Sequence, residues 1–207
     1  VSPEFSLRES GTMRNVGVPY SVGGFPGDHF VVGEGPGKPL TTLTIEPGTT
    51  IQMFPGTAFD VEFVSSEQPA SGAVIAEGTA DAPITFTSSA AVPAAGDWQG
   101  LQFGGVADAS NSFRHVRLEY TGADCGCILI GCSDIEGYEG AIIFSQQPPS
   151  AFFHDTVVAH GSGNGVVLGY RGTLVDFTGG IAFEDLAWCP QTQPHPGSCP
   201  NPLPSCQ

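Results

Sequence analysis

Basic residues are scarce in this sequence of 207 residues. Lysine and arginine together number 6, against 21 aspartates and glutamates, so the formal net charge is −15. Nucleic-acid binding depends on cationic side chains that displace counterions from phosphates, and the composition therefore argues against DNA or RNA as a partner. The same shortage argues against attraction to an anionic membrane surface.

Long apolar runs and a high charge density are missing as well. No stretch approaches the roughly 18 apolar residues that suggest a membrane-spanning helix, so we expect no membrane-spanning segment. Charged residues make up 13% of the chain and hydrophobic residues 40%, a balance that excludes an intrinsically disordered protein. The sequence starts at Val1 without a basic and then apolar leader, and we expect a processed mature form or a fragment.

Glycine and proline, by contrast, are abundant, with 29 and 18 residues. They separate short apolar runs along most of the chain, a pattern that predicts many short strands joined by tight turns and excludes a helical bundle. The expected strands are residues 43–45, 51–53, 58–63, 73–76, 84–87, 98–103, 116–120, 141–144, 156–159, 166–168 and 173–177.

The apolar runs recur at intervals that indicate a repeat architecture. The interval from Val74 to Trp98 is the same as that from Ile142 to Val166, and it amounts to a few tens of residues. A coil of this length with about three short strands is the repeating unit of a parallel β-helix. The sequence therefore predicts stacked coils that share one continuous core.

Two longer segments, 111–122 and 151–162, align with each other, and the alignment places Leu118 on Val158. Their offset exceeds the interval from Ile142 to Val166, because a cysteine-containing segment lies between them. Side chains alternate between the two faces of a strand. This alternation predicts that residues 116, 118 and 120 face the core, and that residues 115, 117 and 119 face solvent.

Three motifs connect the chain to a known family: LTIEPGTTI at 43–51, GAVIAEGTADAPITFT at 72–87 and GDWQGL at 96–101. They resemble bacterial secreted or surface proteins built from right-handed parallel β-helix repeats. VPYSV at 18–22 resembles the strand that such proteins have before their first full coil. The resemblance covers about residues 14–185.

The resemblance implies an all-β fold, a single right-handed parallel β-helix of about six coils. It also implies a location outside the cell or on the bacterial cell surface or outer envelope. The motifs consist of turn glycines and core aliphatic residues without a catalytic set, so they imply no particular activity.

Three parts of the chain are expected to differ in role. Residues 1–40 form an N-terminal segment that leads into or caps the solenoid. Residues 41–187 form the parallel β-helix, with a cysteine-containing loop at 124–139. Residues 188–207 form a proline- and cysteine-rich tail, which we expect to act as a disulfide-tethered strap, because prolines lack the N–H needed to continue a sheet.

Six cysteines fall into two groups of three, and an even count in a lysine-poor acidic chain favours disulfides in an oxidising compartment. Zinc is the rejected alternative, because structural zinc sites show pairs of closely spaced ligands that the tail cysteines do not provide. The pairing stays open. The predicted disulfide residues are Cys125, Cys127, Cys132, Cys189, Cys199 and Cys206.

The acidic loop offers the only candidate metal site. Asp124, Asp134, Glu136 and Glu139 carry the oxygen ligands that calcium prefers. No calcium-loop pattern accompanies them, so a solvated loop is the favoured interpretation and calcium the alternative. No other cofactor is predicted.

A row of outward polar residues provides weak catalytic candidates. The alignment of the two longer segments places His115 beside Asp155 and, on the same surface, Arg114 beside His154. Acid–base catalysis on a sugar acid would need at least a base and a cation. His115 and Asp155 are the candidate bases, and Arg117 is the candidate cation. The residue blocks of polygalacturonase-like hydrolases are absent, and an ordinary solvated surface is the favoured interpretation.

Most aromatic residues are predicted to stack in the core. The strand phenylalanines are Phe59, Phe63, Phe86, Phe103, Phe113, Phe144, Phe153 and Phe177. Trp98 is a possible sugar platform, but a structural role is favoured, because the resembling family carries a tryptophan there.

The sequence therefore predicts a non-enzymatic extracellular solenoid module with a structural, adhesive or binding role. Its expected partners are a glycan or a cell-surface protein, or further copies of itself. The alternative is a polysaccharide lyase or glycoside hydrolase of the parallel β-helix type. A neutral glycan remains compatible with the acidic chain, whereas a polyanionic polysaccharide would be repelled.

Overall fold

The computed structural model describes residues 5–64, 66–123, 139–195 and 205–207. These residues form 17 strands and no helix, which confirms the all-β class. Sheet A contains β1 (Phe5–Leu7), β4 (His29–Val32), β7 (Ala58–Val61), β10 (Gly100–Phe103), β13 (Gly140–Phe144) and β16 (Asn164–Leu168). Sheet B contains β2 (Gly11–Met13), β5 (Thr41–Ile45), β8 (Gly72–Glu77), β11 (Ser112–Arg114) and β14 (Phe153–His154). Sheet C contains β3 (Tyr20–Val22), β6 (Thr50–Met53), β9 (Ile84–Ser88), β12 (Val116–Glu119), β15 (Thr156–Gly161) and β17 (Ile181–Leu186).

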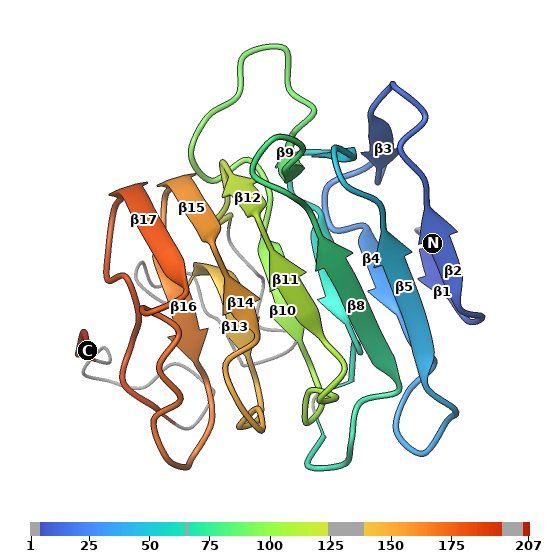
Figure 1. Cartoon of the computed structure of the whole chain (residues 1–207). Helices are drawn as coiled ribbons and strands as arrows, with labels where there is room; N and C mark the ends of the chain where they lie inside the picture. Colours follow the sequence, from blue (N-terminus) through green and yellow to red (C-terminus); the bar gives the residue numbers. More distant parts are fainter. Residues whose placement is uncertain (1–4, 65, 124–138, 196–204) are drawn as a thin grey trace.

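The described strands are arranged as a parallel β-helix, as predicted. The chain visits sheets A, B and C in turn until β15, and the last coil passes from β16 of sheet A to β17 of sheet C. Each strand pairs in parallel with the strand of the same sheet in the neighbouring coil. Sheets A and C hold six strands each, which corresponds to the expected number of about six coils. The strands stack side by side from the N-terminal coil to the C-terminal coil (Figure 1).

The predicted register holds in the later coils. Ile142 pairs with Val166, and Leu118 pairs with Val158, although the second pair is much further apart in sequence than the first. All four side chains are fully buried. Coils therefore differ in length while their inward positions stay aligned.

One predicted equivalence is wrong. Val74 of β8 pairs with Leu43 of β5 rather than corresponding to Trp98. Trp98 comes before β10 and forms an isolated bridge with Thr121. The match between the Val74–Trp98 and Ile142–Val166 intervals is therefore coincidental, because loops of different length separate the strands of successive coils.

The stacked sheets begin before residue 41. Strands β1 to β4 lie within residues 1–40 and pair with strands of the following coils, so this part of the chain is built into the solenoid rather than preceding it. Three of these strands have only three residues, too few to show a clear alternation. Conversely, residues 173–177 form no strand, although Phe177 is fully buried.

Aromatic side chains form ladders in the core, as predicted. Phe103 stacks on Phe144 with ring centroids 4.7 Å apart, and Phe144 stacks on Phe177 at 4.9 Å. Trp98 is fully buried, and its Nε1–H donates a hydrogen bond of 2.7 Å to the backbone oxygen of Glu119. This burial assigns Trp98 a structural role and excludes it as an exposed sugar platform.

In two of the later coils, a single residue with positive φ turns the chain from sheet B to sheet C. His115 has a φ of 46° between β11 and β12, and Asp155 has a φ of 50° between β14 and β15. Histidine and aspartate are among the residues that tolerate this left-handed region best. Each of the aligned segments 111–122 and 151–162 is therefore split between sheets B and C. The corner at each split requires a residue that tolerates positive φ, which explains why His115 and Asp155 occupy the same position.

The C-terminal tail extends sheet A beyond β16. The backbone N–H of Val166 donates to the oxygen of Pro190 at 2.9 Å, and the N–H of Thr192 donates to the oxygen of Val166 at 3.0 Å. The expectation that prolines keep the tail out of the sheet is therefore wrong. Pro190 contributes a carbonyl oxygen to the pairing, which does not require the N–H that proline lacks.

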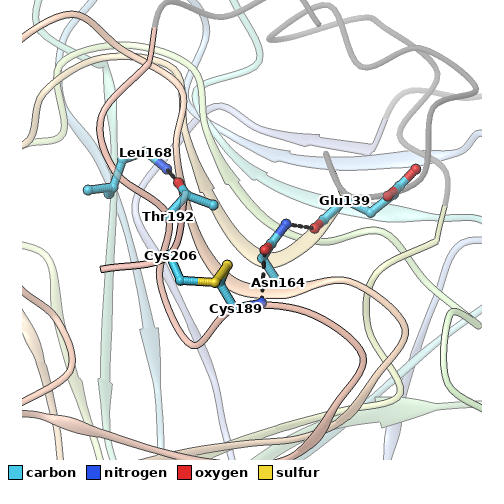
Figure 2. The surroundings of a disulfide bond; sticks show 6 residues. All are labelled: Glu139, Asn164, Leu168, Cys189, Thr192 and Cys206. Atoms are coloured by element: carbon cyan, nitrogen blue, oxygen red, sulfur yellow. Dashed lines mark hydrogen bonds between the residues drawn. A yellow bond between two sulfur atoms is a disulfide. The ribbon is translucent and has the colours of Figure 1, made fainter. Parts of the chain in front are cut away.

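A disulfide between Cys189 and Cys206 closes the tail, with a sequence separation of 17 residues. Thr192 and Cys206 form an antiparallel bridge, so the last residues run back along the tail. Figure 2 shows the disulfide beside Asn164 of β16, whose Oδ1 accepts a hydrogen bond of 3.2 Å from the N–H of Cys189. The described part of the tail is thus tethered to the last coil, as predicted. The other four cysteines, Cys125, Cys127, Cys132 and Cys199, lie outside the described residues.

Candidate functional site

Two of the three weak catalytic candidates lie together at the corner between sheets B and C. His115 Nε2 lies 4.0 Å from Asp155 Oδ2, and the same oxygen accepts a hydrogen bond of 2.9 Å from Arg114 Nη1. The geometry follows the predicted alignment, which also places His154 beside Arg114 in the sheet. More than half of the Asp155 side chain is exposed, and water weakens interactions between such charges.

Arg117, the third candidate, is held apart from this corner. Its Nε–H donates a hydrogen bond to Glu119, and its Nη2 donates to Glu184 Oε2 at 3.2 Å. The hydrogen bond to Glu119 is the main reason why the pKa of Arg117 is raised. Two carboxylates of the protein thus already compensate this positive charge, which is not directed at His115 or Asp155.

A second row of outward side chains lies at the C-terminal ends of β12 and β15. Tyr120 has a φ of 62° and stacks on His160 with ring centroids 5.3 Å apart. His160 Nδ1 in turn lies 3.1 Å from Asp185 Oδ2. Tyr120 is therefore a corner residue that is only partly buried. Its place beside His160 confirms the alignment of segments 111–122 and 151–162, whereas strict alternation wrongly assigns it to the core.

The predicted calcium loop can be placed only at its last residue. Asp124, Asp134 and Glu136 lie outside the described residues. The backbone oxygen of Glu139 accepts a hydrogen bond of 3.0 Å from Asn164 Nδ2 (Figure 2). The residues that the structure describes contain no group of three or more histidine, cysteine, aspartate or glutamate side chains that could hold a metal ion.

A different polar cluster lies on sheet A in the first coils. His29 of β4 and Asp60 of β7 are on neighbouring strands, and their Nδ1 and Oδ2 atoms are 2.7 Å apart. The side chain of His29 is 10% exposed, and that of Asp60 is completely buried. Phe63 packs edge-on against the imidazole at a centroid distance of 5.0 Å. This pair is the most deeply buried contact between ionisable side chains in the described residues.

Asp60 occupies an outward position of sheet A that is nevertheless inaccessible to water. Its neighbours along β7, Phe59 and Val61, belong to the core, so Asp60 faces the opposite side of the sheet. In the register it lies between Val31 of β4 and Gln102 of β10, which are also buried. Burial raises the pKa of Asp60, and the hydrogen bond and charge of His29 offset part of this effect.

His29 also lines a pocket of about 340 Å³ on the outer side of sheet A. We call it the sheet-A pocket. Ser6 and Arg8 line it from the first coil, and Glu34 and Lys38 from the loop after β4. Val31 of β4, Gly33 and the segment 62–64, which follows β7, complete its wall.

The wall of the sheet-A pocket is fixed by hydrogen bonds. Glu62 is buried with a φ of 66°. Its carboxylate accepts hydrogen bonds of 2.8 Å from Ser71 Oγ, 3.1 Å from the N–H of Ser71 and 3.3 Å from the N–H of Val64. Gly33 approaches Ser71 so closely that a Cβ atom would lie 2.7 Å from its Oγ. These contacts join the loop after β4 to the segment after β7.

Reasoning from the sequence missed this site. Asp60 and Glu62 alternate with Phe59, Val61 and Phe63, and period two assigns the carboxylates to the solvent side. Alternation identifies the face of a sheet but not what packs on that face. Phe63, predicted to stack in the core, lies instead at the pocket. An available signal was the position of His29 directly before the apolar run Phe-Val-Val.

Comparison with known proteins supports the fold. Residues 30–110, which include most of β4 and all strands to β10, match a family described as pectate-lyase-like β-helix domains. Comparison with curated proteins and with solved structures found no match. The described residues contain no helix long and apolar enough to cross a membrane. The chain is thus similar in its first half to a pectate-lyase-like β-helix.

Proposed function

We propose that this chain is a non-enzymatic extracellular solenoid module that binds a glycan or a protein partner. Its coils supply a rigid surface for such a role, because outward side chains are held in register by parallel strands. The Cys189–Cys206 disulfide supports an extracellular location, since disulfides persist in oxidising compartments.

The observation that carries the proposal is the internal pairing of the outward charges. Arg117 is engaged by Glu119 and Glu184, and Arg114 by Asp155. A catalytic cation must be able to meet negative charge that develops on a substrate. Side chains that already satisfy one another on an exposed surface suit a structural or binding surface better than a reaction centre.

The charge of the whole chain supports the same proposal. A net charge of −15 repels acidic polysaccharides at long range and slows their approach. A neutral glycan is not subject to this repulsion, because stacking and hydrogen bonding do not depend on net charge. The proposal therefore favours neutral ligands over uronate polymers.

The alternative is a polysaccharide lyase or glycoside hydrolase, and the family match of residues 30–110 favours it. In that case His115 or Asp155 would act as the base, and an arginine would neutralise the substrate. The paired state of Arg114 and Arg117 opposes this assignment.

A glycan array that reports both binding and product release separates the two functions. The array should contain neutral glycans, pectin and alginate, each with and without calcium. We expect binding without unsaturated or new reducing-end products. Product release that disappears in both His115→Ala and Asp155→Ala would establish the enzymatic alternative instead, and Arg171→Ala serves as a surface control.

A further inference from the structure

We propose that the sheet-A pocket binds a short neutral saccharide. The inference rests on the proposed function, to which it adds a place and a ligand class. It concerns the first coils, at Ser6, Arg8, His29, Glu34, Lys38 and the segment 62–64, and not the row of paired charges at Arg114 to Arg117.

The size of the pocket suits such a ligand. Its volume of about 340 Å³ falls at the lower end of the usual range for small-molecule sites, which runs from about 300 to 1,000 Å³. A mono- or disaccharide fits this range, whereas a long chain would have to continue over the surface. The pocket is thus suited to a chain end or a short branch.

The lining of the pocket combines apolar and polar groups. Phe63, Val31 and Val64 provide apolar contact, and an aromatic ring can pack against the C–H face of a sugar. Arg8 and Lys38 can donate hydrogen bonds, and Glu34 can accept them. Sugar hydroxyls both donate and accept, so this mixture matches their chemistry better than that of a purely apolar ligand.

The charges around the pocket nearly balance. Arg8 and Lys38 are two of the six basic residues in the chain, and Glu34 and Glu62 lie at the same pocket. Arg8 Nε is 3.9 Å from Glu34 Oε1, so part of the positive charge is compensated on the protein. A neutral ligand needs no compensating charge at such a pocket. A ligand carboxylate would in addition be repelled by the net charge of −15 on the chain, which favours a neutral sugar over an acidic one.

Two polar groups at the pocket, His29 and Glu62, are held in place before any ligand arrives. His29 is fixed between Asp60 and Phe63, and Glu62 is fixed by Ser71. Groups that are already ordered lose little conformational entropy on binding.

Isothermal titration calorimetry and ¹H–¹⁵N spectra of the full chain test the proposal. The probes are glucose, galactose, mannose and N-acetylglucosamine with their 1,4-linked disaccharides, and glucuronate and galacturonate as acidic probes. Arg8→Ala and Lys38→Ala remove exposed side chains and should leave folding intact. We expect each variant to weaken binding of a neutral probe about tenfold, as loss of a hydrogen bond to a charged group would.

Arg171→Ala is the matched control, because it removes an exposed arginine far from the pocket, and it should leave the affinity unchanged. Chemical-shift changes should centre on β1, β4 and residues 62–64. Neutral probes that bind with shifts elsewhere and unchanged affinity in Arg8→Ala would overturn the assignment of the pocket but not the proposed function. Binding of the acidic probes alone at the pocket would overturn the ligand class. Absence of all glycan binding would overturn the inference. The proposed function would then depend on whether the chain binds a protein partner.

Discussion

The first and last coils of this solenoid use the same residue types in opposite surroundings. In the first coils, His29 and Asp60 are buried together on sheet A beside a pocket. In the later coils, Arg114 and Asp155 are exposed at a corner and pair with each other, and His115 lies beside them with 30% of its side chain exposed. The ends differ as well, because the tail and its disulfide cover the last strand of sheet A.

The difference shows that residue type alone does not decide what a polar cluster does on a parallel β-helix. Burial makes a charged pair costly to break, since the remaining partner stays in an environment of low polarity. Exposure makes a similar pair nearly neutral for stability. The following predictions test this contrast, in order of decreasing effect.

The largest effect is expected when a carboxylate is placed in the last coils without a partner. Leu118 is fully buried in the core, so Leu118→Asp would bury a charge with no histidine beside it and should prevent folding. Circular dichroism and solubility measure this outcome. Leu118→Met is the control and should cost less than about 1.5 kcal/mol. A soluble Leu118→Asp protein with a cooperative unfolding transition would contradict the assigned register.

Removal of one partner from the buried pair should have the next largest effect. His29→Ala leaves Asp60 buried without its hydrogen bond and should lower the free energy of unfolding by about 3 kcal/mol. Urea denaturation measures the change. In a His29→Ala/Asp60→Ala double variant, the second substitution should cost much less than it does in the wild type. Additive costs would show that the two side chains are not coupled.

The disulfide should stabilise the last coils specifically. A Cys189→Ala/Cys206→Ala variant opens a loop with a sequence separation of 17 residues and should lose about 3 kcal/mol. Hydrogen exchange should show loss of protection in residues 189–195 and β16 first, while β4 and β7 keep theirs. Equal loss of protection in all coils would mean that the tail is not a local cap.

The buried carboxylate should also make stability depend on pH. Because burial raises the pKa of Asp60, the folded protein keeps this proton over a pH range in which the unfolded chain releases it. The contribution to stability is therefore present at lower pH and is lost as the pH rises through this range. The free energy of unfolding of the wild type, relative to Asp60→Asn, should fall as the pH rises from about 4. A difference that stays constant or rises would contradict this sign, and Asp155→Asn is the exposed control.

The smallest effect is expected for the exposed pair. Arg114→Ala removes the hydrogen-bond partner of Asp155 and should change the free energy of unfolding by less than about 1 kcal/mol. Urea denaturation in low and high salt measures it. A cost similar to that of His29→Ala would mean that the corner is a stabilising site equivalent to the buried pair.

Most of the solenoid can be predicted from local patterns. Ten of the eleven expected strand segments coincide with strands of the structure, and residues 173–177 are the exception. The equivalence of Ile142 and Val166 was also predicted correctly, because both lie in apolar runs of neighbouring coils. Strand β3 lies within the segment 18–22 that the resemblance identifies as a strand. Strands β1, β2 and β4 escaped prediction because they have only three or four residues, and because loops of variable length obscure the period.

The candidate site is harder to predict than the fold. His29 and Asp60 are 31 residues apart, and no motif connects them. They become neighbours only because β4 and β7 pair in the sheet. The burial of Asp60 likewise depends on neighbours from other coils, such as Gln102. The row at His115 and Asp155, by contrast, could be predicted, since both residues occupy the same position of aligned coils.

The sequence by itself determined the all-β class, the stacked coils, the aromatic ladders and the recurrent polar corner, because each depends on residue periodicity along the chain. Only the tertiary structure decided that residues 5–32 join the coils, that the proline-rich tail pairs with β16, and that His29 and Asp60 meet beside a pocket. These features depend on which strands become neighbours and on what covers their outer faces. Periodicity assigns a side chain to a face, but packing between distant segments decides whether that face meets water.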